Sequence, residues 1–394
     1  MTVHRIALDP PVPEIHAAEL AGRVFFVSEA ILDFALVRSA DMVEAVDVVL
    51  RDALDLDQLA RKLRFVVAND VLDQKPLARK VIWRGDTASG QPGDVYAELL
   101  RRGMASETGE GQIAVGEPVL SLMDGLDAAI TTLAADEFET REYRYPTLIP
   151  VETMRRCGYF RSFPQLMMFV SRLHGDVDTY RGFLDAMADG GDVADGLRAH
   201  CDHYDYCLPP TMCFHTYHQL ADRPLGDPSL VVTSRGKSFR FESRYRRSLE
   251  RLWDFTIREI VFLGSREFVL EARRRLMERS FALVDSLGLG GLCEVANDPF
   301  FIEPGTAERV WSQHLLESKY ELRLPLDDAR DVAVGSFNFH ERFFGESFGI
   351  ETPEGPVYTA CAGFGLERFA YAFLCRHGLD PGRWPSEARK ALAS

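Results

Sequence analysis

The stretch that decides the fold is Ser238 to Gly264, S-F-R-F-E-S-R-Y-R-R-S-L-E-R-L-W-D-F-T-I-R-E-I-V-F-L-G, in which two predicted strands flank an arginine-rich loop. Arg240 and Glu242 are two residues apart, so on a strand they lie on one face. The same rule places Phe255 and Glu259 together on the second strand. Arginine forks bind phosphate oxygens and an aromatic ring can stack on a base, so this hairpin is a candidate nucleoside triphosphate site. The alternative is an ordinary hairpin with a solvated charged face.

A glycine-rich turn near the C-terminus is a second candidate for phosphate binding. In Cys361 to Phe373, C-A-G-F-G-L-E-R-F-A-Y-A-F, two glycines precede Arg368, and an apolar helix is predicted to follow. The third glycine of a G-x-G-x-x-G loop is missing, which argues against a Rossmann or Walker site. Gly363 and Gly365 would let the backbone pack tightly while Arg368 reaches a phosphate. A plain glycine turn before a core helix is the alternative.

The composition is that of a globular protein: 394 residues, 46% hydrophobic and 27% charged, with a formal charge of −15. Such an acidic chain is a poor general binder of nucleic-acid phosphates, which require clustered Lys and Arg. The odd number of cysteines, seven, argues against a disulfide framework, so we expect reduced thiols, some of them metal ligands. The N-terminus has no apolar signal region, and the longest apolar stretch, Phe25 to Val37, contains Glu29 and Asp33. We therefore expect a cytoplasmic protein that does not span a membrane.

The sequence divides into a small accessory α/β region, residues 1–90, and one large unit, residues 91–394. The turn-rich segment Gly85 to Gly93 marks the boundary. In the accessory region, Asp41 to Leu54 and Leu56 to Leu63 have helix-like patterns.

The large unit is rich in predicted strands. It begins with a predicted helix at Val119 to Phe138, followed by Tyr143 to Pro150, whose prolines favour an edge or interface strand. The other predicted elements are strands at Leu230 to Thr233, Ser238 to Ser243, Trp253 to Leu263, Cys293 to Ala296, Tyr320 to Leu324 and Asp331 to Phe339, and a long helix at Arg266 to Leu287. Few β-α-β alternations occur, so we expect an α+β fold with an antiparallel sheet flanked by helices.

Together these motifs resemble the catalytic domain of class II aminoacyl-tRNA synthetases, over residues 94 to 390. Each of the three motifs of that class has a counterpart, in the expected order. The counterparts are Val119 to Pro146 for motif 1, a long helix then a strand with proline; Phe239-Arg240-Phe241-Glu242 with Arg251, Phe255 and Glu259 for motif 2; and Gly363, Gly365 and Arg368 for motif 3. The resemblance implies the class II antiparallel fold and the use of ATP.

Within that class the chain is most similar to the amino acid:[carrier protein] ligases, which are truncated homologues of seryl-tRNA synthetases. The supporting stretches are Tyr145 to Pro150, Cys157 to Phe160, Val295 to Phe301, Ser336 to His340 and Phe344 to Glu346. The resemblance implies that ATP activates a small amino acid as an aminoacyl-adenylate, releasing pyrophosphate. The phosphopantetheine thiol of an acyl or peptidyl carrier protein then accepts the aminoacyl group. The resemblance also implies a homodimer.

The resemblance assigns roles to individual residues. Arg240 would hold the α-phosphate and Arg368 the outer phosphates, so these two are the candidate catalytic residues. The further candidate ATP contacts are Glu242, Arg251, Leu252 and Phe255, the last against the adenine. The candidate amino-acid contacts are Glu259, Ser336 and Asn338. Mg²⁺ would accompany ATP, but the usual acidic ligand aligns with Val332, so the phosphates and Glu242 or Asp331 would hold the ion.

The resemblance also implies one zinc ion, held by two cysteines and the glutamate that ends motif 2. The corresponding residues are Cys213, within Leu208 to Tyr217, Glu259 and Cys361. Three protein ligands leave zinc an open fourth position, which a substrate α-amine can fill. A structural zinc cluster is the alternative, although it lacks a compact C-x2-C pair. Its members would be Cys201, Cys207 and Cys213 with His200, His203, His215 and His218.

Two rival functions are tRNA charging and a catalytically inactive synthetase paralogue. Residues 1–75 contain 13 acidic and 8 basic residues, which disfavours a tRNA-binding arm. The intact arginines and Phe255 of motifs 2 and 3 argue against an inactive paralogue. Carrier proteins are commonly acidic, so a basic patch could steer their docking. The candidate clusters are Arg155-Arg156, Arg244 with Arg246 and Arg247, and Arg273-Arg274-Arg275.

Overall fold

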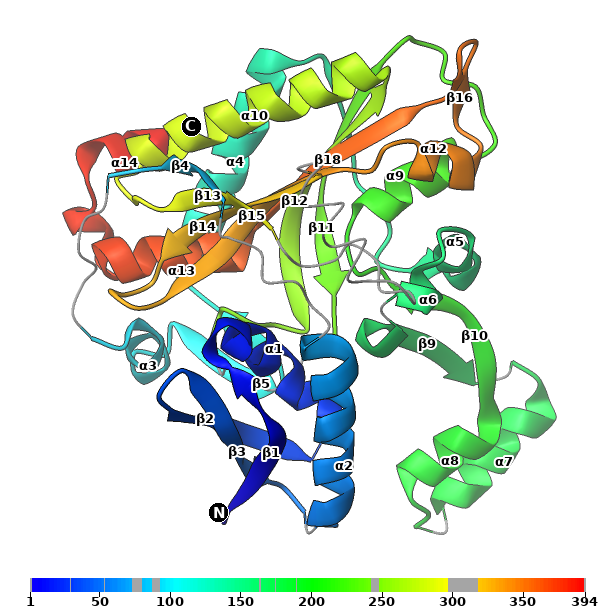
Figure 1. Ribbon diagram of the computed structural model, residues 1–394. Helices are drawn as coiled ribbons and strands as arrows, with labels where there is room; N and C mark the ends of the chain where they lie inside the picture. The colour runs from blue at the N-terminus through cyan, green and yellow to red at the C-terminus, as the bar shows by residue number, and fades with distance from the viewer. Residues whose placement is uncertain are drawn as a thin grey trace.

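The computed structural model describes residues 2–28, 30–52, 54–72, 80–86, 93–162, 164–173, 175–188, 190–241, 248–296 and 318–392. These residues form an eight-stranded sheet of order β4-β13-β14-β15-β18-β12-β11-β7 (Figure 1). Neighbouring strands are antiparallel except β7, which runs parallel to β11. The strands are β4 (Val81–Arg84), β7 (Thr140–Tyr143), β11 (Leu230–Phe239), β12 (Asp254–Gly264), β13 (Leu292–Val295), β14 (Lys319–Pro325), β15 (Asp331–Phe339) and β18 (Tyr358–Gly365). The antiparallel sheet predicted from the sequence is confirmed.

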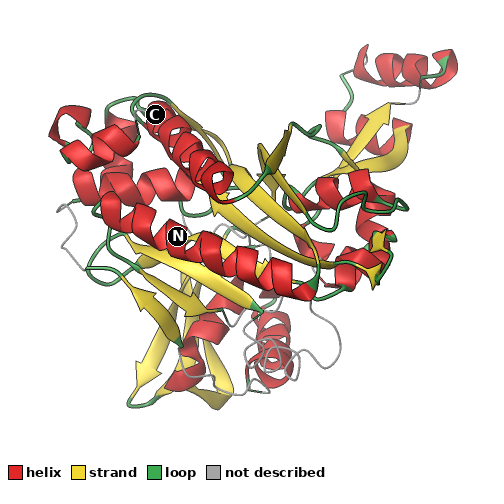
Figure 2. Ribbon diagram, turned by 90° about the horizontal axis from the view of Figure 1, so that it is seen from above, coloured by secondary structure: helices red, strands yellow, loops and turns green. Residues whose placement is uncertain are grey.

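The central strand β12 is apolar on both faces because each face carries a core. Ile260 and Phe262 belong to the main core, whereas Val261 and Leu263 belong to a second core on the other face. The main core lies under α4 (Val119–Glu137), α10 (Arg266–Ser286) and α13 (Leu366–His377), which contact the sheet. Figure 2 shows helices packed against the strands of this sheet. A strand covered on both faces needs a continuous apolar run, as β12 has.

Short helices build the second core, on the other face of the sheet. They are α5 (Val151–Arg156), α6 (Tyr159–Ser162), α9 (Cys213–Leu220) and α12 (Phe343–Phe348). Beside them lies a three-stranded sheet of order β8-β10-β9, formed by β8 (Ile149–Pro150), β9 (Met168–Leu173) and β10 (Cys201–Leu208). The helices α7 (Val177–Ala188) and α8 (Val193–His200) lie at the end of this three-stranded sheet that is remote from the large sheet (Figure 1).

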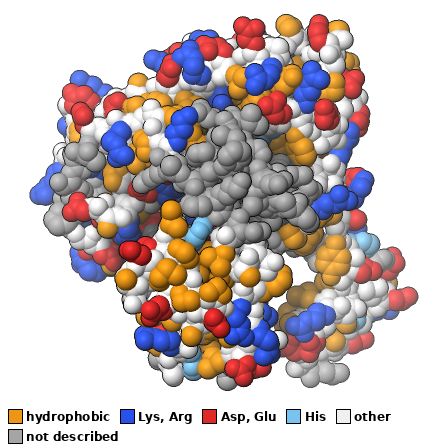
Figure 3. Space-filling model, viewed as in Figure 1, with side chains coloured by type: hydrophobic (Ala, Val, Ile, Leu, Met, Phe, Trp, Pro, Cys, Tyr) orange, Lys and Arg blue, Asp and Glu red, His pale blue; other side chains and the backbone are white. Residues whose placement is uncertain are grey.

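The N-terminal unit has a sheet and a core of its own. Its strands β1 (Val3–Pro13), β2 (Ile31–Ser39) and β3 (Met42–Leu50) pair in the order β1-β3-β2, with α1 (Ala17–Val27) and α2 (Leu56–Val66) packed on them. The helix expected at Asp41 to Leu54 is wrong, because Met42–Leu50 is the central strand of this sheet. Its valines at 43, 46 and 48 are buried, and β-branched side chains favour such a strand. Figure 3 shows hydrophobic side chains gathered on the face of this unit.

The strand β4 falls inside the accessory region of the sequence analysis, yet it pairs with β13 of the large sheet. We therefore propose that the accessory unit ends before β4, rather than at residue 90.

The predicted strands Leu230 to Thr233 and Ser238 to Ser243 are partly one strand, because β11 is continuous to Phe239. No helix among the described residues is long and apolar enough to cross a bilayer. The remaining elements are η1 (Glu14–His16), η2 (Val67–Val71), α3 (Val95–Arg101), β5 (Ala105–Gly109), β6 (Gln112–Val115), η3 (Pro164–Leu166), β16 (Glu351–Thr352), β17 (Gly355–Pro356), η4 (Pro381–Arg383) and α14 (Ser386–Ala391).

Candidate active site

One face of the central strands gathers most of the predicted site residues. Glu259 of β12 lies opposite Gly363 of β18, which in turn lies opposite Ser336 of β15. Asn338 lies opposite Cys361 on the same pair of strands. Directly opposed residues in an antiparallel ladder share a face, and residues two apart on one strand share it too. The strand register alone therefore brings these five positions to one face.

Gly363 of motif 3 packs closely against β12. A Cβ atom at Gly363 would lie 2.9 Å from Ile257 Cδ1 and 3.4 Å from both carboxylate oxygens of Glu259. A side chain there would crowd the tip of Ile257 and come into van der Waals contact with the Glu259 carboxylate. A Cβ atom at Gly365 would approach only Arg368 Cδ, 4.0 Å away, so no close contact requires this second glycine.

A buried group of three metal-ligating side chains forms where α9 meets this face. Cys213 begins α9, and its sulfur, a carboxylate oxygen of Glu259 and the Cys361 sulfur all lie within 4.8 Å of one another. The three residues are at most 2% exposed. The structure thus brings together the three zinc ligands that the resemblance implies, from segments far apart in the sequence.

Each member of the group is hard to ionise without a cation. Burial raises the pKa of Cys213 and of Glu259. The contact with Cys213, together with burial, raises the pKa of the Cys361 thiol well above its ordinary value. Thr211 Oγ1 donates a 2.6 Å hydrogen bond to Glu259 Oε2 and so orients the carboxylate. Two thiols and one carboxylate are a donor set that suits Zn²⁺, and a bound cation would favour their charged forms.

The alternative zinc cluster is not assembled in the described part of the chain. The group of Cys213, Glu259 and Cys361 is the one metal-ligating set found there. Cys207 is buried in β10 and its thiol donates to Ile149 O over 3.7 Å, as a packed core cysteine does. Cys157, Cys293 and Cys375 are buried as well, whereas Cys201 is partly exposed.

Arg240 and Phe255 lie together beside the three-residue group. The Arg240 Cζ atom is 5.4 Å from the centroid of the Phe255 ring, and its Nε donates to Pro210 O over 3.1 Å. Pro210 is three residues before Cys213, so this bond ties the motif 2 arginine to the entry of α9. The positive charge of Arg240 also lowers the pKa of Glu259, against the larger effect of burial.

Arg368 is anchored at the start of α13 through main-chain carbonyls. Its Nε donates to Glu250 O over 2.6 Å and its NH1 group donates to Ala333 O over 3.4 Å. The Glu250 carboxylate, 4% exposed, pairs with Arg330 at 3.1 Å. The motif 3 arginine is therefore held between the end of the motif 2 loop and β15.

The other predicted ATP contacts have different environments. Arg251 is exposed just before β12, whereas Leu252 is buried in the main core. Glu242 lies outside the described residues. Val332 is buried, and the neighbouring carboxylate of Asp331 accepts a 2.8 Å hydrogen bond from Arg323. Asp331 is thus engaged in an ion pair at the position where a magnesium ligand was expected.

Two residues of the site, Thr211 and His340, received no role from the sequence. His340 Nε2 lies 3.6 Å from the Cys361 sulfur, next to Asn338, whose Nδ2 lies 3.5 Å from the same atom. Burial, with a smaller effect of Arg273, lowers the pKa of His340 to about 3. The signal that could have found His340 is its spacing, two residues after Asn338 and directly beyond the end of β15.

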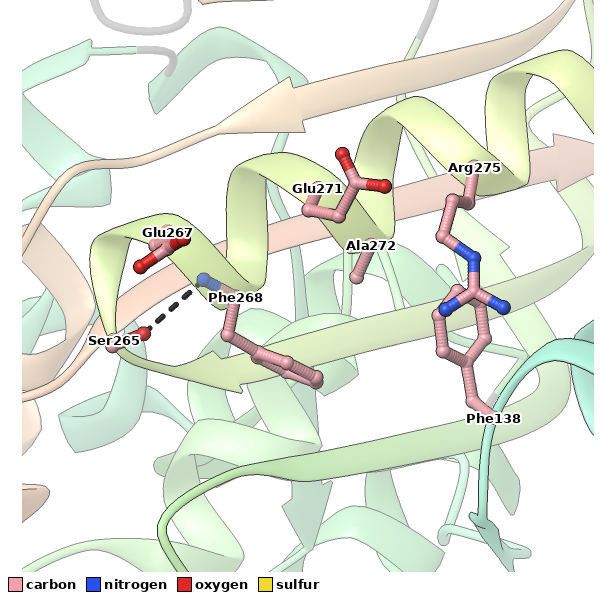
Figure 4. A pocket seen from close by; sticks show the side chains of 7 residues that line it. All are labelled: Phe138, Ser265, Glu267, Phe268, Glu271, Ala272 and Arg275. Carbon is pink, nitrogen blue, oxygen red and sulfur yellow. Dashed lines mark hydrogen bonds between the residues drawn. The ribbon is translucent and has the colours of Figure 1, made fainter.

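A surface pocket of about 270 Å³ lies elsewhere, along α10 (Figure 4). Ser265 caps this helix by accepting a 3.1 Å bond from the Phe268 N–H, and Arg275 Cζ lies 5.2 Å from the Phe138 ring centroid. The lining residues are Phe138, Ser265, Glu267, Phe268, Glu271, Ala272 and Arg275. None of the predicted site residues is among them, so this pocket is not the candidate active site.

The chain resembles two groups of curated proteins, although no family model matches it. It is 33% identical over 312 residues to amino acid--[acyl-carrier-protein] ligase 1 of Bradyrhizobium diazoefficiens, a match that covers 78% of this chain and 92% of that protein. Ligase 2 of the same organism is 34% identical over 307 residues, which cover 76% of this chain and 87% of the relative. The type-2 serine--tRNA ligase of Methanococcus maripaludis is 30% identical over 294 residues, 72% of this chain but only 57% of the relative.

Solved structures share the fold. The M. kandleri SerRS, solved in complex with A. aeolicus tRNASec, has a TM-score of 0.71 and 24% identity, and the match covers 91% of this chain and 73% of that chain. The cytoplasmic serine-tRNA ligase from Naegleria fowleri, in complex with AMP, has a TM-score of 0.62 and 10% identity over 86% of this chain and 78% of that chain. These matches confirm the class II synthetase fold that the motifs predicted.

Proposed function

The chain belongs to the family of amino acid--[acyl-carrier-protein] ligases, and on this premise we propose that it activates a small amino acid with ATP and transfers it to a carrier protein. The observation that carries the proposal is the buried group of Cys213, Glu259 and Cys361, with Arg240 and Phe255 beside it. The group would select an amino acid at the site where ATP is bound.

The first step needs little acid–base chemistry. The amino-acid carboxylate attacks the α-phosphorus of ATP, the bond to the bridging oxygen breaks, and pyrophosphate leaves. We propose that Arg240 binds the α-phosphate and that Arg368 and the exposed Arg251 bind the outer phosphates. Phe255, which already lies against Arg240, would stack on the adenine. Such positioning and charge neutralisation account for most of the rate enhancement in phosphoryl chemistry.

Zinc would be held by Cys213, Glu259 and Cys361, and it would supply an open coordination position for the substrate α-amine. Asn338 Oδ1 is buried without a hydrogen-bond partner in the described part of the chain. Buried polar atoms are nearly always satisfied in functional proteins. We propose that this oxygen, with the neighbouring Ser336 hydroxyl, binds the amino-acid substrate. Mg²⁺ would accompany the triphosphate, held mainly by its phosphates because Asp331 is paired with Arg323.

In the second step the phosphopantetheine thiol attacks the carbonyl carbon of the adenylate, a thioester forms, and AMP leaves. The described candidates for a basic docking patch are weak. Arg155 pairs with Glu152 and Arg156 with Asp222, and Arg274 pairs with Glu271 and Glu278. Arg273 is buried. The third cluster, Arg244 with Arg246 and Arg247, lies outside the described residues and stays a prediction.

Pyrophosphate exchange with each amino acid in turn tests the activation step. The best amino acid and ATP are then offered with a pantetheinylated carrier protein or with total tRNA. Labelled carrier with unlabelled tRNA is the expected result. Labelled tRNA with unlabelled carrier would replace the ligase proposal by the synthetase alternative, and no exchange with any amino acid would favour an inactive paralogue.

The relationship to type-2 serine--tRNA ligases makes tRNA charging the second candidate. The chain spans little more than half of the M. maripaludis relative, however, and its first 75 residues are acidic.

We further propose a homodimer through α4 and the exposed edge strand β7, to be tested by light scattering at micromolar concentration. The cytoplasmic location stays a prediction from the sequence.

A further inference from the structure

His340 lies next to Cys361 of the three-residue group, and hydrogen bonds hold both its main-chain N–H and its carbonyl. Its N–H donates to Thr359 O over 2.9 Å, and its carbonyl accepts from the Phe343 N–H over 3.0 Å. Its imidazole packs edge-on against the ring of Phe344, with the centroids 4.9 Å apart. The residue is 8% exposed. In this position Nε2 of the ring is directed at the Cys361 sulfur, 3.6 Å away.

The other ring nitrogen faces two hydroxyl groups. Nδ1 lies 3.2 Å from Thr359 Oγ1 and 3.4 Å from the hydroxyl of Tyr217. A hydroxyl can donate a hydrogen bond, whereas a metal-bound thiolate can only accept one. The arrangement is consistent when Nδ1 accepts and Nε2 carries the proton. The hydroxyl groups that donate to Nδ1 thus favour the tautomer in which Nε2 carries the proton.

We propose that His340 is a positioning residue that donates its Nε2–H to the Cys361 thiolate when the metal is bound, with Tyr217 and Thr359 holding it in that tautomer. This inference rests on the zinc site of the proposed function. Asn338 Nδ2, 3.5 Å from the same sulfur, is the second donor. Two N–H donors stabilise the negative charge of the buried thiolate and fix its orientation, so Cys361 stays ionised and directed at the metal.

The probe is Co²⁺ bound to the protein in place of zinc, read by the sulfur-to-cobalt charge-transfer absorption. Hydrogen bonds to sulfur stabilise its lone pairs and raise the energy of this band. His340→Leu removes the donor and should shift the band to longer wavelength. It should also weaken Zn²⁺ binding about 10- to 100-fold in a chelator competition. His340→Gln, whose amide can donate in place of the imidazole, should restore most of both properties.

Two further variants separate hydrogen bonding from packing. Tyr217→Phe keeps the ring but removes a hydroxyl from Nδ1, so it should shift the band in the same direction by a smaller amount. Phe348→Leu alters the same core, 6.0 Å from the Tyr217 ring, and should leave the band unchanged.

The outcomes distinguish this inference from the proposed function. Wild-type protein that binds neither Co²⁺ nor Zn²⁺ overturns the metal site, and the inference with it. Metal bound normally, with wild-type spectra and affinities in His340→Leu and Tyr217→Phe, overturns only the role of His340. Should His340→Leu fail to fold, Tyr217→Phe and His340→Gln decide, because an unshifted band in the former contradicts the proposed donor.

Discussion

Arg258 and Glu259 are neighbours on β12, yet they face two different electrostatic environments. Arg258 is directed to the main-core face, where its Nε donates to Asp127 Oδ1 of α4 over 2.7 Å and its NH1 group to Glu142 over 2.9 Å. Glu259 is directed to the opposite face, beside two thiols. On the main-core face the buried Arg258 cation is paired with two carboxylates. On the opposite face the Glu259 carboxylate lies beside two thiols, which would also be negatively charged if they ionised.

The difference is one of charge balance. The Arg258 network is complete, because the favourable ion pairs with Asp127 and Glu142 offset the cost of burying the guanidinium and raise its pKa. The group around Glu259 is incomplete without a cation, since Arg240 is shared with a main-chain carbonyl and the Phe255 ring. We infer that the first face was selected for holding α4 on the sheet and the second for binding a metal.

Removing a ligand of the incomplete group should have the largest effect. Cys213→Ala, Glu259→Ala and Cys361→Ala should each lose stoichiometric zinc and abolish pyrophosphate exchange, because one of three ligands is gone. Metal analysis and the exchange assay measure both. Cys207→Ala is the matched control, a buried cysteine outside the group, and should keep about one zinc per chain. Active protein without zinc would contradict the assignment.

Arg368→Ala should act on the chemistry and leave the metal in place. A charge clamp that forms mainly in the transition state lowers kcat and kcat/KM together, by about 100- to 1000-fold. Arg376→Ala is the control, because Arg376 lies on the same helix and its Nε also donates to a main-chain carbonyl, Gly288 O. Wild-type exchange rates in Arg368→Ala would show that motif 3 has another role.

Breaking the complete network should cost stability without loss of zinc. Arg258→Met leaves the buried Asp127 with only the longer 3.4 Å contact to Arg235, and breaking a buried ion pair from one side costs about 3–5 kcal/mol. Chemical denaturation measures the free energy of unfolding, and metal analysis should still find one zinc per chain. Adding Asp127→Leu should recover much of the loss, since an apolar pair replaces the ion pair. A loss of zinc in Arg258→Met would mean that the two faces are coupled.

The smallest effect concerns Glu321 of β14, on the site face opposite Ser336. Burial opposes its ionisation, but Lys319 and Arg323 outweigh burial and lower its pKa from 4.5 to about 2. A lowered carboxyl pKa stabilises the fold above the unfolded value, and this contribution is lost as the pH falls from about 4.5 to about 2. Glu321→Gln should therefore flatten the dependence of unfolding free energy on pH in that window. Parallel curves for the two proteins would contradict the ion pairs.

Local patterns predicted much of the large sheet. Strand β15, Asp331–Phe339, has the limits that the sequence predicts. Helix α10, Arg266–Ser286, begins where predicted and ends one residue earlier than the predicted Leu287. These elements have strong periodicity and clear caps, such as Ser265 before α10. The helix prediction for Met42–Leu50 was wrong because the valines at 43 and 46 fit a helical spacing as well as a buried strand. Only the pairing of this segment with β1 and β2 makes it a strand.

The sequence by itself determined the class of fold and the identity of the chemical groups, because motifs 2 and 3 carry arginines and glycines at fixed spacings on regular elements. Only the tertiary structure decided how those groups meet. The sulfurs of Cys213 and Cys361 come from residues 148 positions apart and are joined by the register of β12, β18 and β15 with the start of α9. The role proposed for His340 likewise depends on Tyr217, 123 residues away, and on Thr359, 19 residues away. Contacts between distant segments follow from packing and strand register, and no local pattern contains them.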